Sequence, residues 1–193
     1  MLTSHPPLPS SDDALDFTRP DAPSAPSPSP TEVARAREEA RAGTPQLRDT
    51  GFYVSIARHN PVRIAPRNGS KYVILVVEDD ADLAQLLIDI FMLAGFEVHW
   101  ASNRAEINAE MNRKPTVDLI LMDIVLPDAN GLEVLQRLRG HPRLAKLPVI
   151  MMTAKSSGED VAAGLTAGAD GYVTKPFKVS GLVKAVNLVL GNA

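Results

Sequence analysis

The stretch YVILVVEDD, residues 72–80, decides the fold that we expect for this chain. It is an unbroken run of aliphatic and mostly β-branched residues that ends abruptly in three acids. Such runs are typical of strands buried on both faces of a parallel sheet. The next residues place leucines and an isoleucine on one helical face, and Gly95 is a good terminator for that helix. The stretch therefore predicts the first β–α unit of an alternating fold.

The same alternation continues to the end of the chain. Further strands are expected at residues 96–100, 117–122, 148–153 and 171–174, and further helices at residues 103–112, 131–139, 158–167 and 179–190. Five strands and five helices in strict alternation predict an α/β fold with a parallel sheet, right-handed crossovers and helices on both faces. In such sheets a ligand site lies at the carboxyl ends of the strands.

The residues before this pattern have a different composition. Residues 1–43 are expected to be a largely disordered Pro/Ser-rich tail, with a possible short helix at 31–42 that is capped by Thr31. Residues 44–70 are interpreted as a linker or a peripheral docking segment, and an added strand is a further possibility. Residues 71–193 are expected to form the folded domain.

Composition excludes several classes of function. The chain has no cysteine, which excludes disulfides, cysteine-bound metals and thiol nucleophiles. It shows neither a secretion signal nor a long apolar segment, so we expect a cytoplasmic protein with no membrane partner. The formal net charge is −3, which does not favour direct binding of nucleic acid.

Polar residues follow the predicted strands at the points where the strands end. They are Glu78, Asp79 and Asp80 after the first strand, Asp123 after the third, Thr153 after the fourth and Lys175 after the fifth. Converging carboxylates repel one another, and a bound cation is the natural way to keep them ionised. Ligands that are all oxygen indicate Mg²⁺ or a similar hard cation. A lysine and a hydroxyl at the same rim suit an incoming phosphoryl group.

Four motifs in this order resemble the receiver domain of response regulators from two-component signal transduction systems. They are VILVVEDD, LILMDIVLPDANGLEVL, VIMMTA and GADGYVTKPF, and the resemblance covers about two-thirds of the chain. The resemblance implies a CheY-like, flavodoxin-like fold with a doubly wound five-stranded parallel sheet and five helices. It also implies a phosphoprotein that takes part in a phosphorelay.

The resemblance assigns a role to each matching residue. Asp123 would be the phosphoacceptor. Mg²⁺ would be bound by Asp79, Asp123 and the backbone carbonyl of Val125, and by Glu78 through water. The phosphoryl group would be bound by Lys175 and Thr153, with Ala154 kept small for access, and Pro176 would follow a cis peptide bond.

The family's switch has a counterpart here in Thr153 and Tyr172. The resemblance implies that phosphorylation draws Thr153 inward and that the aromatic residue on the last strand rotates. Tyr172 is alternatively an ordinary half-buried strand aromatic. Asp80 is interpreted as a helix cap, and Asp128 and Asn130 as turn and cap residues of the next helix.

The predicted function follows from these roles. A histidine kinase or a histidine phosphotransfer protein would phosphorylate Asp123, and the phosphorylated chain would bind a downstream protein. The chain would be no enzyme beyond its own phosphorylation and dephosphorylation. The alternative is a degenerate receiver that acts as a constitutive protein-interaction module.

Val125 bears on two further expectations. Phosphatases of the haloacid dehalogenase class need a second acid two residues after the nucleophile, and Val125 stands at that position. In receivers an apolar residue there implies slow hydrolysis of the aspartyl phosphate. No DNA-binding or catalytic segment follows the predicted domain in this sequence, so we expect either a stand-alone receiver or a piece of a larger regulator, and we favour the first.

Overall fold

The computed structural model describes residues 25–55, 65–67, 69–113, 117–154 and 157–192. The disorder expected for the start of the tail falls on residues 1–24, which lie outside these ranges. The strands are β1 (Phe52–Val54), β2 (Val73–Val77), β3 (Glu97–Ala101), β4 (Leu119–Asp123), β5 (Val149–Thr153) and β6 (Gly171–Thr174). The helices are α1 (Pro30–Thr50), α2 (Ala81–Leu93), α3 (Arg104–Asn112), α4 (Gly131–Gly140), α5 (Gly158–Ala167) and α6 (Val179–Leu190).

One sheet runs through the molecule with the strand order β1-β6-β5-β4-β2-β3. The five strands from β2 to β6 are parallel, as predicted, whereas β1 pairs with β6 in the antiparallel sense. The expectation of five strands and five helices is therefore wrong, because the sheet has six strands and the described chain has six helices. Both additional elements come from residues before 71.

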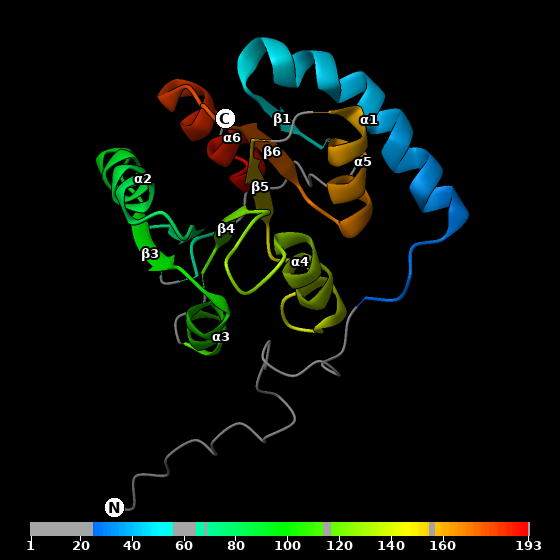
Figure 1. Ribbon diagram of the computed structural model, residues 1–193. Coiled ribbons are helices and arrows are strands. Elements are labelled where there is room, and N and C mark those ends of the chain that lie inside the picture. Colours follow the sequence, from blue (N-terminus) through cyan, green and yellow to red (C-terminus); the bar gives the residue numbers. More distant parts are fainter. Residues whose placement is uncertain (1–24, 56–64, 68, 114–116, 155–156, 193) are drawn as a thin grey trace, which may run out of the picture.

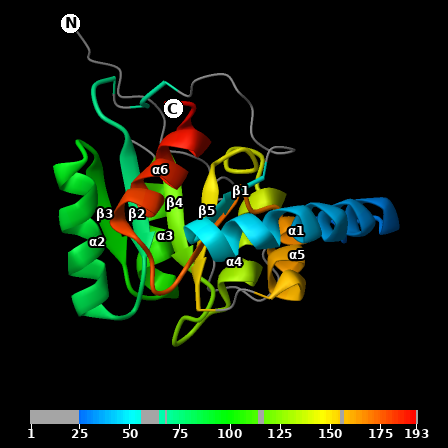
Figure 2. The ribbon, with the colours of Figure 1, turned by 90° about the horizontal axis from the view of Figure 1, so that it is seen from above.

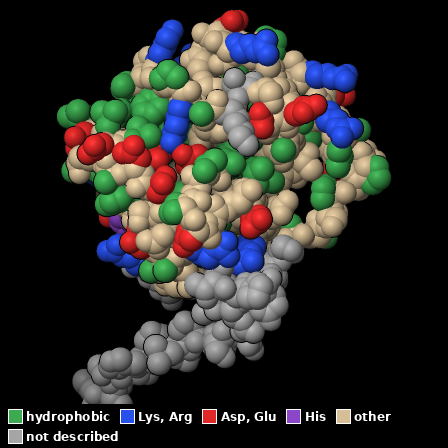
Figure 3. Space-filling model, in the orientation of Figure 1, with side chains coloured by type: hydrophobic (Ala, Val, Ile, Leu, Met, Phe, Trp, Pro, Cys, Tyr) green, Lys and Arg blue, Asp and Glu red, His purple; other side chains and the backbone are tan. Residues whose placement is uncertain are grey.

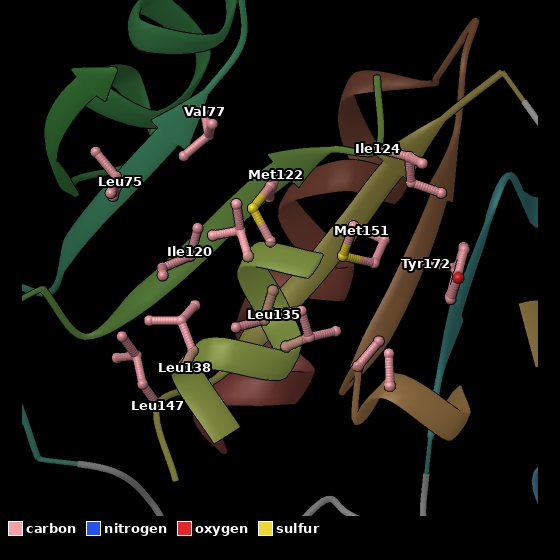
Figure 4. Close-up of a cluster of buried hydrophobic side chains, with 14 of the residues drawn as sticks. Leu75, Val77, Ile120, Met122, Ile124, Leu135, Leu138, Leu147, Met151 and Tyr172 are labelled. Atoms are coloured by element: carbon pink, nitrogen blue, oxygen red, sulfur yellow. The ribbon is translucent and has the colours of Figure 1, made fainter. Parts of the chain in front are cut away.

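Helices cover both faces of the sheet (Figures 1 and 2). Side chains of α2 and α6 pack on one face, and side chains of α3, α4 and α5 pack on the other. Strands β2, β4 and β5 are buried along their whole length, which explains their unbroken apolar sequences. Figure 4 shows Ile120, Met122 and Met151 of the central strands facing Leu135 and Leu138 of α4.

Side-chain caps begin most of the helices. Asp80 accepts hydrogen bonds from the backbone amides of Asp82 and Leu83, and Asn130 accepts one from Leu132, which confirms both as caps. Asp128 does not serve the helix that follows it. Its carboxylate instead accepts from the amide of Arg104, the first residue of α3.

Helix α1 is longer than the sequence pattern predicts, and Ser29 rather than Thr31 caps it. Ser29 forms a capping box with Glu32, and the helix continues through Pro45 to Thr50. The expected boundary between residues 43 and 44 falls inside it. The pattern predicted an early end because glycine and proline disfavour helix, but packing against α5 outweighs that preference here. Within the described residues, no helix is long and apolar enough to cross a membrane.

Candidate functional site

The predicted polar residues meet at one edge of the sheet. Because β2, β4, β5 and β6 are parallel, their carboxyl ends lie on the same side. The chain passes from β2 outward to β3 and then returns to the other side of β2 to form β4, so the strand order reverses between β2 and β4. Such a reversal opens a crevice at the strand ends. Glu78, Asp79 and Asp123 lie at this crevice.

Lys175 joins the two buried carboxylates of the site. Its Nζ lies 2.6 Å from Asp123 Oδ2 and 2.7 Å from Glu78 Oε2. The side chain of Glu78 is only 2% exposed and that of Asp123 is 12% exposed. These bonds are partly shielded from bulk water, where a charge-assisted hydrogen bond is stronger than in open solvent. Lys175 therefore neutralises part of the negative charge of two carboxylates that folding has buried.

The pKa shifts in this group follow from burial and charge. Burial raises the pKa of Glu78 above its ordinary 4.5, and the opposing effect of Lys175 does not cancel that rise. Burial alone would lower the pKa of Lys175. The hydrogen bonds and negative charges of Asp123 and Glu78 outweigh this effect, so the pKa of Lys175 lies above 10.5.

Three carboxylates of the site are close enough to share a metal ion. Ligand oxygens of Glu78, Asp79 and Asp123 all lie within 4.8 Å of one another. Asp79 is exposed while the other two are buried, so the cluster opens toward solvent on one side. In Figure 3, acidic side chains gather on the surface between the positions of α2 and β4 in Figure 1. Oxygen-only donors that are partly open to water suit a hard cation that retains water ligands.

The backbone after β4 holds the other oxygen of Asp123. The amide of Val125 donates to Asp123 Oδ1 over 3.1 Å, while Oδ2 receives Lys175. The Val125 side chain itself is 64% exposed. The carboxylate of Asp123 is thus oriented from both sides.

Two residues of the site region were missed by the sequence interpretation. The indole N–H of Trp100 donates to the carbonyl of Glu78 over 2.8 Å and supports the turn that carries the acids. Gly131 lies directly against the carbonyl of Asp123, where a Cβ atom would clash with backbone. The glycine after the Asn130 cap was the signal available for the second of these. A tryptophan on an edge strand carries no comparable signal.

The remaining predicted residues lie around this centre. Thr153, the last residue of β5, is 1% exposed, and its carbonyl accepts from the amide of Lys175. Ala154 is exposed. The peptide bond between Lys175 and Pro176 is cis.

Tyr172 is completely buried, and its hydroxyl reaches beneath α5. It donates to the carbonyl of Asp160 over 3.0 Å, and Gly164 of α5 leaves the room that the hydroxyl occupies. Burial raises the pKa of the Tyr172 hydroxyl. Figure 4 shows the ring on β6 at the edge of the hydrophobic cluster.

Asp118 and Asp170 directly precede β4 and β6. Asp118 accepts the amides of Arg67 and Val73, at the start of β2. Asp170 accepts the amide of Val149 and pairs with Arg139 at 2.9 Å. Both carboxylates lie at the edge of the sheet opposite the site and stabilise the starts of strands.

Comparison with known proteins identifies a single family over most of the folded part. The family model described as "Response regulator receiver domain" matches residues 74–187. The phosphate regulon transcriptional regulatory protein PhoB of Pseudomonas aeruginosa is 38% identical over 118 residues, which are 61% of this chain and 51% of PhoB. The chain spans about half the length of the curated relatives it matches.

Solved structures show the same fold. Chemotaxis response regulator CheY4 of Vibrio cholerae has a TM-score of 0.59 and 29% identity, with 62% of this chain and 99% of that one covered. The receiver domain of a sensor histidine kinase of P. aeruginosa has a TM-score of 0.57 and 25% identity, with 63% of this chain and 98% of that one covered. That structure has a magnesium ion coordinated in its active site cleft.

Proposed function

We propose that Asp123 accepts a phosphoryl group from a phosphohistidine, since this chain belongs to the response regulator receiver family. The observation that carries the proposal is the setting of Asp123 itself. Its carboxylate ends a buried central strand, lies 2.6 Å from Lys175 Nζ and shares an acidic cluster with Glu78 and Asp79. A nucleophilic carboxylate needs this combination of access, orientation and charge compensation.

The proposed transfer is an in-line displacement at phosphorus. A carboxylate oxygen of Asp123 forms the new O–P bond while the P–N bond to the histidine breaks. The bonding electrons stay with the imidazole nitrogen, which is protonated from its surroundings. Lys175, already placed between the carboxylates, compensates the negative charge of the arriving group. The hydroxyl of Thr153 would donate to a phosphoryl oxygen, and the small side chain of Ala154 would leave the entrance open.

Mg²⁺ fits the donors that this chain provides. We propose that Asp79 and Asp123 bind it directly, together with the carbonyl of Val125, and that Glu78 binds it through water. Mg²⁺ at this place would neutralise charge on the phosphoryl oxygens and on the carboxylates. The magnesium ion in the related kinase receiver structure supports the choice of Mg²⁺ as the cation.

Phosphorylation would change the surface that a partner recognises. We assign the switch to Thr153 and Tyr172. Thr153 lies on β5 and Tyr172 on β6, and these two strands are paired neighbours in the sheet. The phosphodonor would be a histidine kinase or a phosphotransfer protein, and the target a protein, because a net charge of −3 does not favour nucleic acid. Catalysis would be limited to the chain's own phosphorylation and dephosphorylation. Val125 would keep the dephosphorylation slow.

Intact-mass measurement with acetyl phosphate and Mg²⁺ tests the proposal. The wild-type chain is expected to gain one phosphoryl group, and Asp123→Asn none. Chelation of Mg²⁺ is expected to abolish the gain in the wild type. If the wild-type chain gains no mass under any of these conditions, the acceptor role is wrong, and a constitutive interaction module becomes the better description.

A further inference from the structure

Residues 30–55, which precede the receiver domain in the chain, form an arm on one side of it. The arm consists of α1, Gly51 and β1, followed by Ser55. Strand β1 adds to the edge of β6, with Tyr53 opposite Tyr172 and Val54 opposite Gly171. The backbone hydrogen-bonding groups on the outer edge of β6 are therefore paired in the described structure, because β1 of the arm occupies that edge. Figure 2 shows α1 lying alongside α5.

Helix α1 packs on the domain through a face made mostly of small residues. Ala36, Ala40, Gly43 and Thr44 are buried on this face, together with the larger Leu47. The small residues allow two helices to approach closely, and α1 makes its main packing against α5. A Cβ atom on Gly43 would meet the ring of Tyr53 at 2.5 Å, so the helix and the strand of the arm also fit closely against each other. Ser55 Oγ donates to Glu39 over 2.9 Å and closes the arm on itself.

A short path of contacts connects the arm with Asp123. Asp123 Oδ2 is bonded to Lys175, and the residue before Lys175 is Thr174, the last residue of β6. The amide of Thr174 donates to the carbonyl of Gly51 over 2.9 Å, and its hydroxyl reaches the same oxygen over 3.3 Å. Gly51 is the left-handed residue that ends α1 and begins β1. The hinge of the arm is thus two hydrogen-bonded contacts away from the acceptor carboxylate.

A second path passes through α5. The hydroxyl of Tyr172 bonds the carbonyl of Asp160 in the first turn of that helix. Thr44 of α1 lies against Gly158, the first residue of the same turn. Strand β5 ends at Thr153, just before this turn. Both strands that end at the site therefore support the surface on which the arm lies.

We propose that the arm occupies the α5–β6 surface in the unphosphorylated chain, and that phosphorylation of Asp123 weakens the docking of the arm on this surface. This inference rests on the proposed function. A phosphoryl group on Asp123 adds charge and volume beside Lys175, and a change in the position of Lys175 passes to Thr174, the residue before it at the end of β6. The docked arm fits the unphosphorylated position of Thr174, which donates both hydrogen bonds to the carbonyl of Gly51. A state in which Thr174 moves would therefore bind the arm less well. Because residues 56–72 tether the arm to β2, a released arm stays at high local concentration and can rebind.

Hydrogen exchange of the full chain measures how stably the arm is docked. Amides of residues 47–54 are compared before and after phosphorylation with acetyl phosphate and Mg²⁺, with intact mass recorded on the same samples. We expect exchange to become at least about five-fold faster in the phosphorylated chain, the lower end of typical coupling between sites. Asp123→Asn treated in the same way should show no change.

The outcomes separate the two proposals. A gain of one phosphoryl group without faster exchange in the arm overturns this inference and leaves the acceptor role intact. The absence of any mass gain overturns the acceptor role instead. Faster exchange that also occurs in Asp123→Asn shows a nonspecific effect of the reagent, and it likewise contradicts the coupling.

Linkage supplies a reciprocal test with a matched pair of variants. Gly43→Ala places a methyl group against Tyr53 and should weaken docking, whereas Gln46→Ala changes an exposed position of the same helix. Coupling between sites is reciprocal for binding equilibria. Beryllofluoride with Mg²⁺, a mimic of the phosphoryl group, should therefore bind Gly43→Ala several-fold more tightly than Gln46→Ala. Equal affinities, with arm exchange accelerated in Gly43→Ala alone, would refute the coupling.

Discussion

Replacement of Gly131 by alanine tests whether close packing under the acceptor is required. Gly131 is the first residue of α4, and a Cβ atom there would lie 3.0 Å from Ile124 Cα and 3.1 Å from the Asp123 carbonyl carbon, with the Asp123 carbonyl oxygen nearer still. These atoms are all backbone and cannot rotate away. The start of α4 and the end of β4 must separate by about 0.8 Å for the oxygen contact to reach 3.0 Å.

The loss of folding stability in Gly131→Ala can be estimated from the known effect of overpacking a protein interior. Forcing extra volume into a packed site destabilises by about 1–3 kcal/mol, which corresponds to a fall of roughly 3–10 °C in the unfolding midpoint for a chain of this size. The displaced carbonyl belongs to Asp123, so its carboxylate moves relative to Lys175 as well. A misplacement approaching 1 Å can reduce a rate by about 100-fold. We therefore expect both stability and the acetyl phosphate reaction to decrease.

Gly158→Ala is the matched control. Gly158 is also the first residue of a helix that follows a side-chain cap, but its Cβ atom would meet only Thr44 Oγ1 at an ordinary 3.6 Å. Thermal unfolding and the initial phosphorylation rate are measured for both variants, with Gly158→Ala expected to remain close to wild type in each. If Gly131→Ala has the midpoint and rate of Gly158→Ala, the contact with the Asp123 carbonyl does not constrain the site.

Three further predictions concern other parts of the molecule. Asp170→Asn removes the negative charge that pairs with Arg139, whose side chain is only 7% exposed, and urea unfolding should show a loss of about 3–5 kcal/mol; a loss below about 1 kcal/mol would contradict a buried pair. The pKa of Glu32 lies below 4.5 because the backbone amide and hydroxyl of Ser29 bond its carboxylate, so its contribution to α1 is present above pH 4.5 and lost as pH falls through the lowered pKa. Below pH 4.5, the hydrogen-exchange protection of the first turn of α1, corrected for intrinsic exchange, should therefore fall in the wild type toward the value of Glu32→Gln. Parallel pH profiles of the wild type and Glu32→Gln would refute this. Trp100, the only tryptophan, bonds a carbonyl of the acidic cluster, so Mg²⁺ should change its fluorescence with a saturable curve that K⁺ at matched ionic strength does not reproduce.

The arm shows where interpretation of local sequence was insufficient. The buried face of its helix is made mostly of small residues, with Leu47 as the one large side chain, and the helix also contains Gly43 and Pro45. The glycine and the proline in particular indicate a weak or interrupted helix. Strand β1 is three residues long and pairs with a strand more than one hundred positions later. Such elements owe their stability to tertiary contacts, and propensity over a short window does not contain those contacts.

The acidic site is an intermediate case. The order of acids, hydroxyl and lysine at strand ends predicted that they would meet, because parallel strands bring their carboxyl ends to one edge. The pairing of Lys175 with both Glu78 and Asp123, and the support from Trp100 and Gly131, required the three-dimensional arrangement. The contacts of Lys175 and Trp100 join residues that are far apart in the chain, and no local pattern encodes them. Gly131 lies closer to Asp123 in the chain, and its place after the Asn130 cap was a local signal.

The sequence by itself determined the parallel frame from β2 to β6 and the identity of the residues at its carboxyl edge. It did so because burial on both faces demands unbroken apolar strands, and the polar residues of the site stand where those apolar runs end. Only the tertiary structure decided that residues 30–54 complete the sheet and that Gly51 lies beside the end of β6. Those features arise from backbone hydrogen bonds and close packing between distant segments, whose free energy exists only once the rest of the domain has folded.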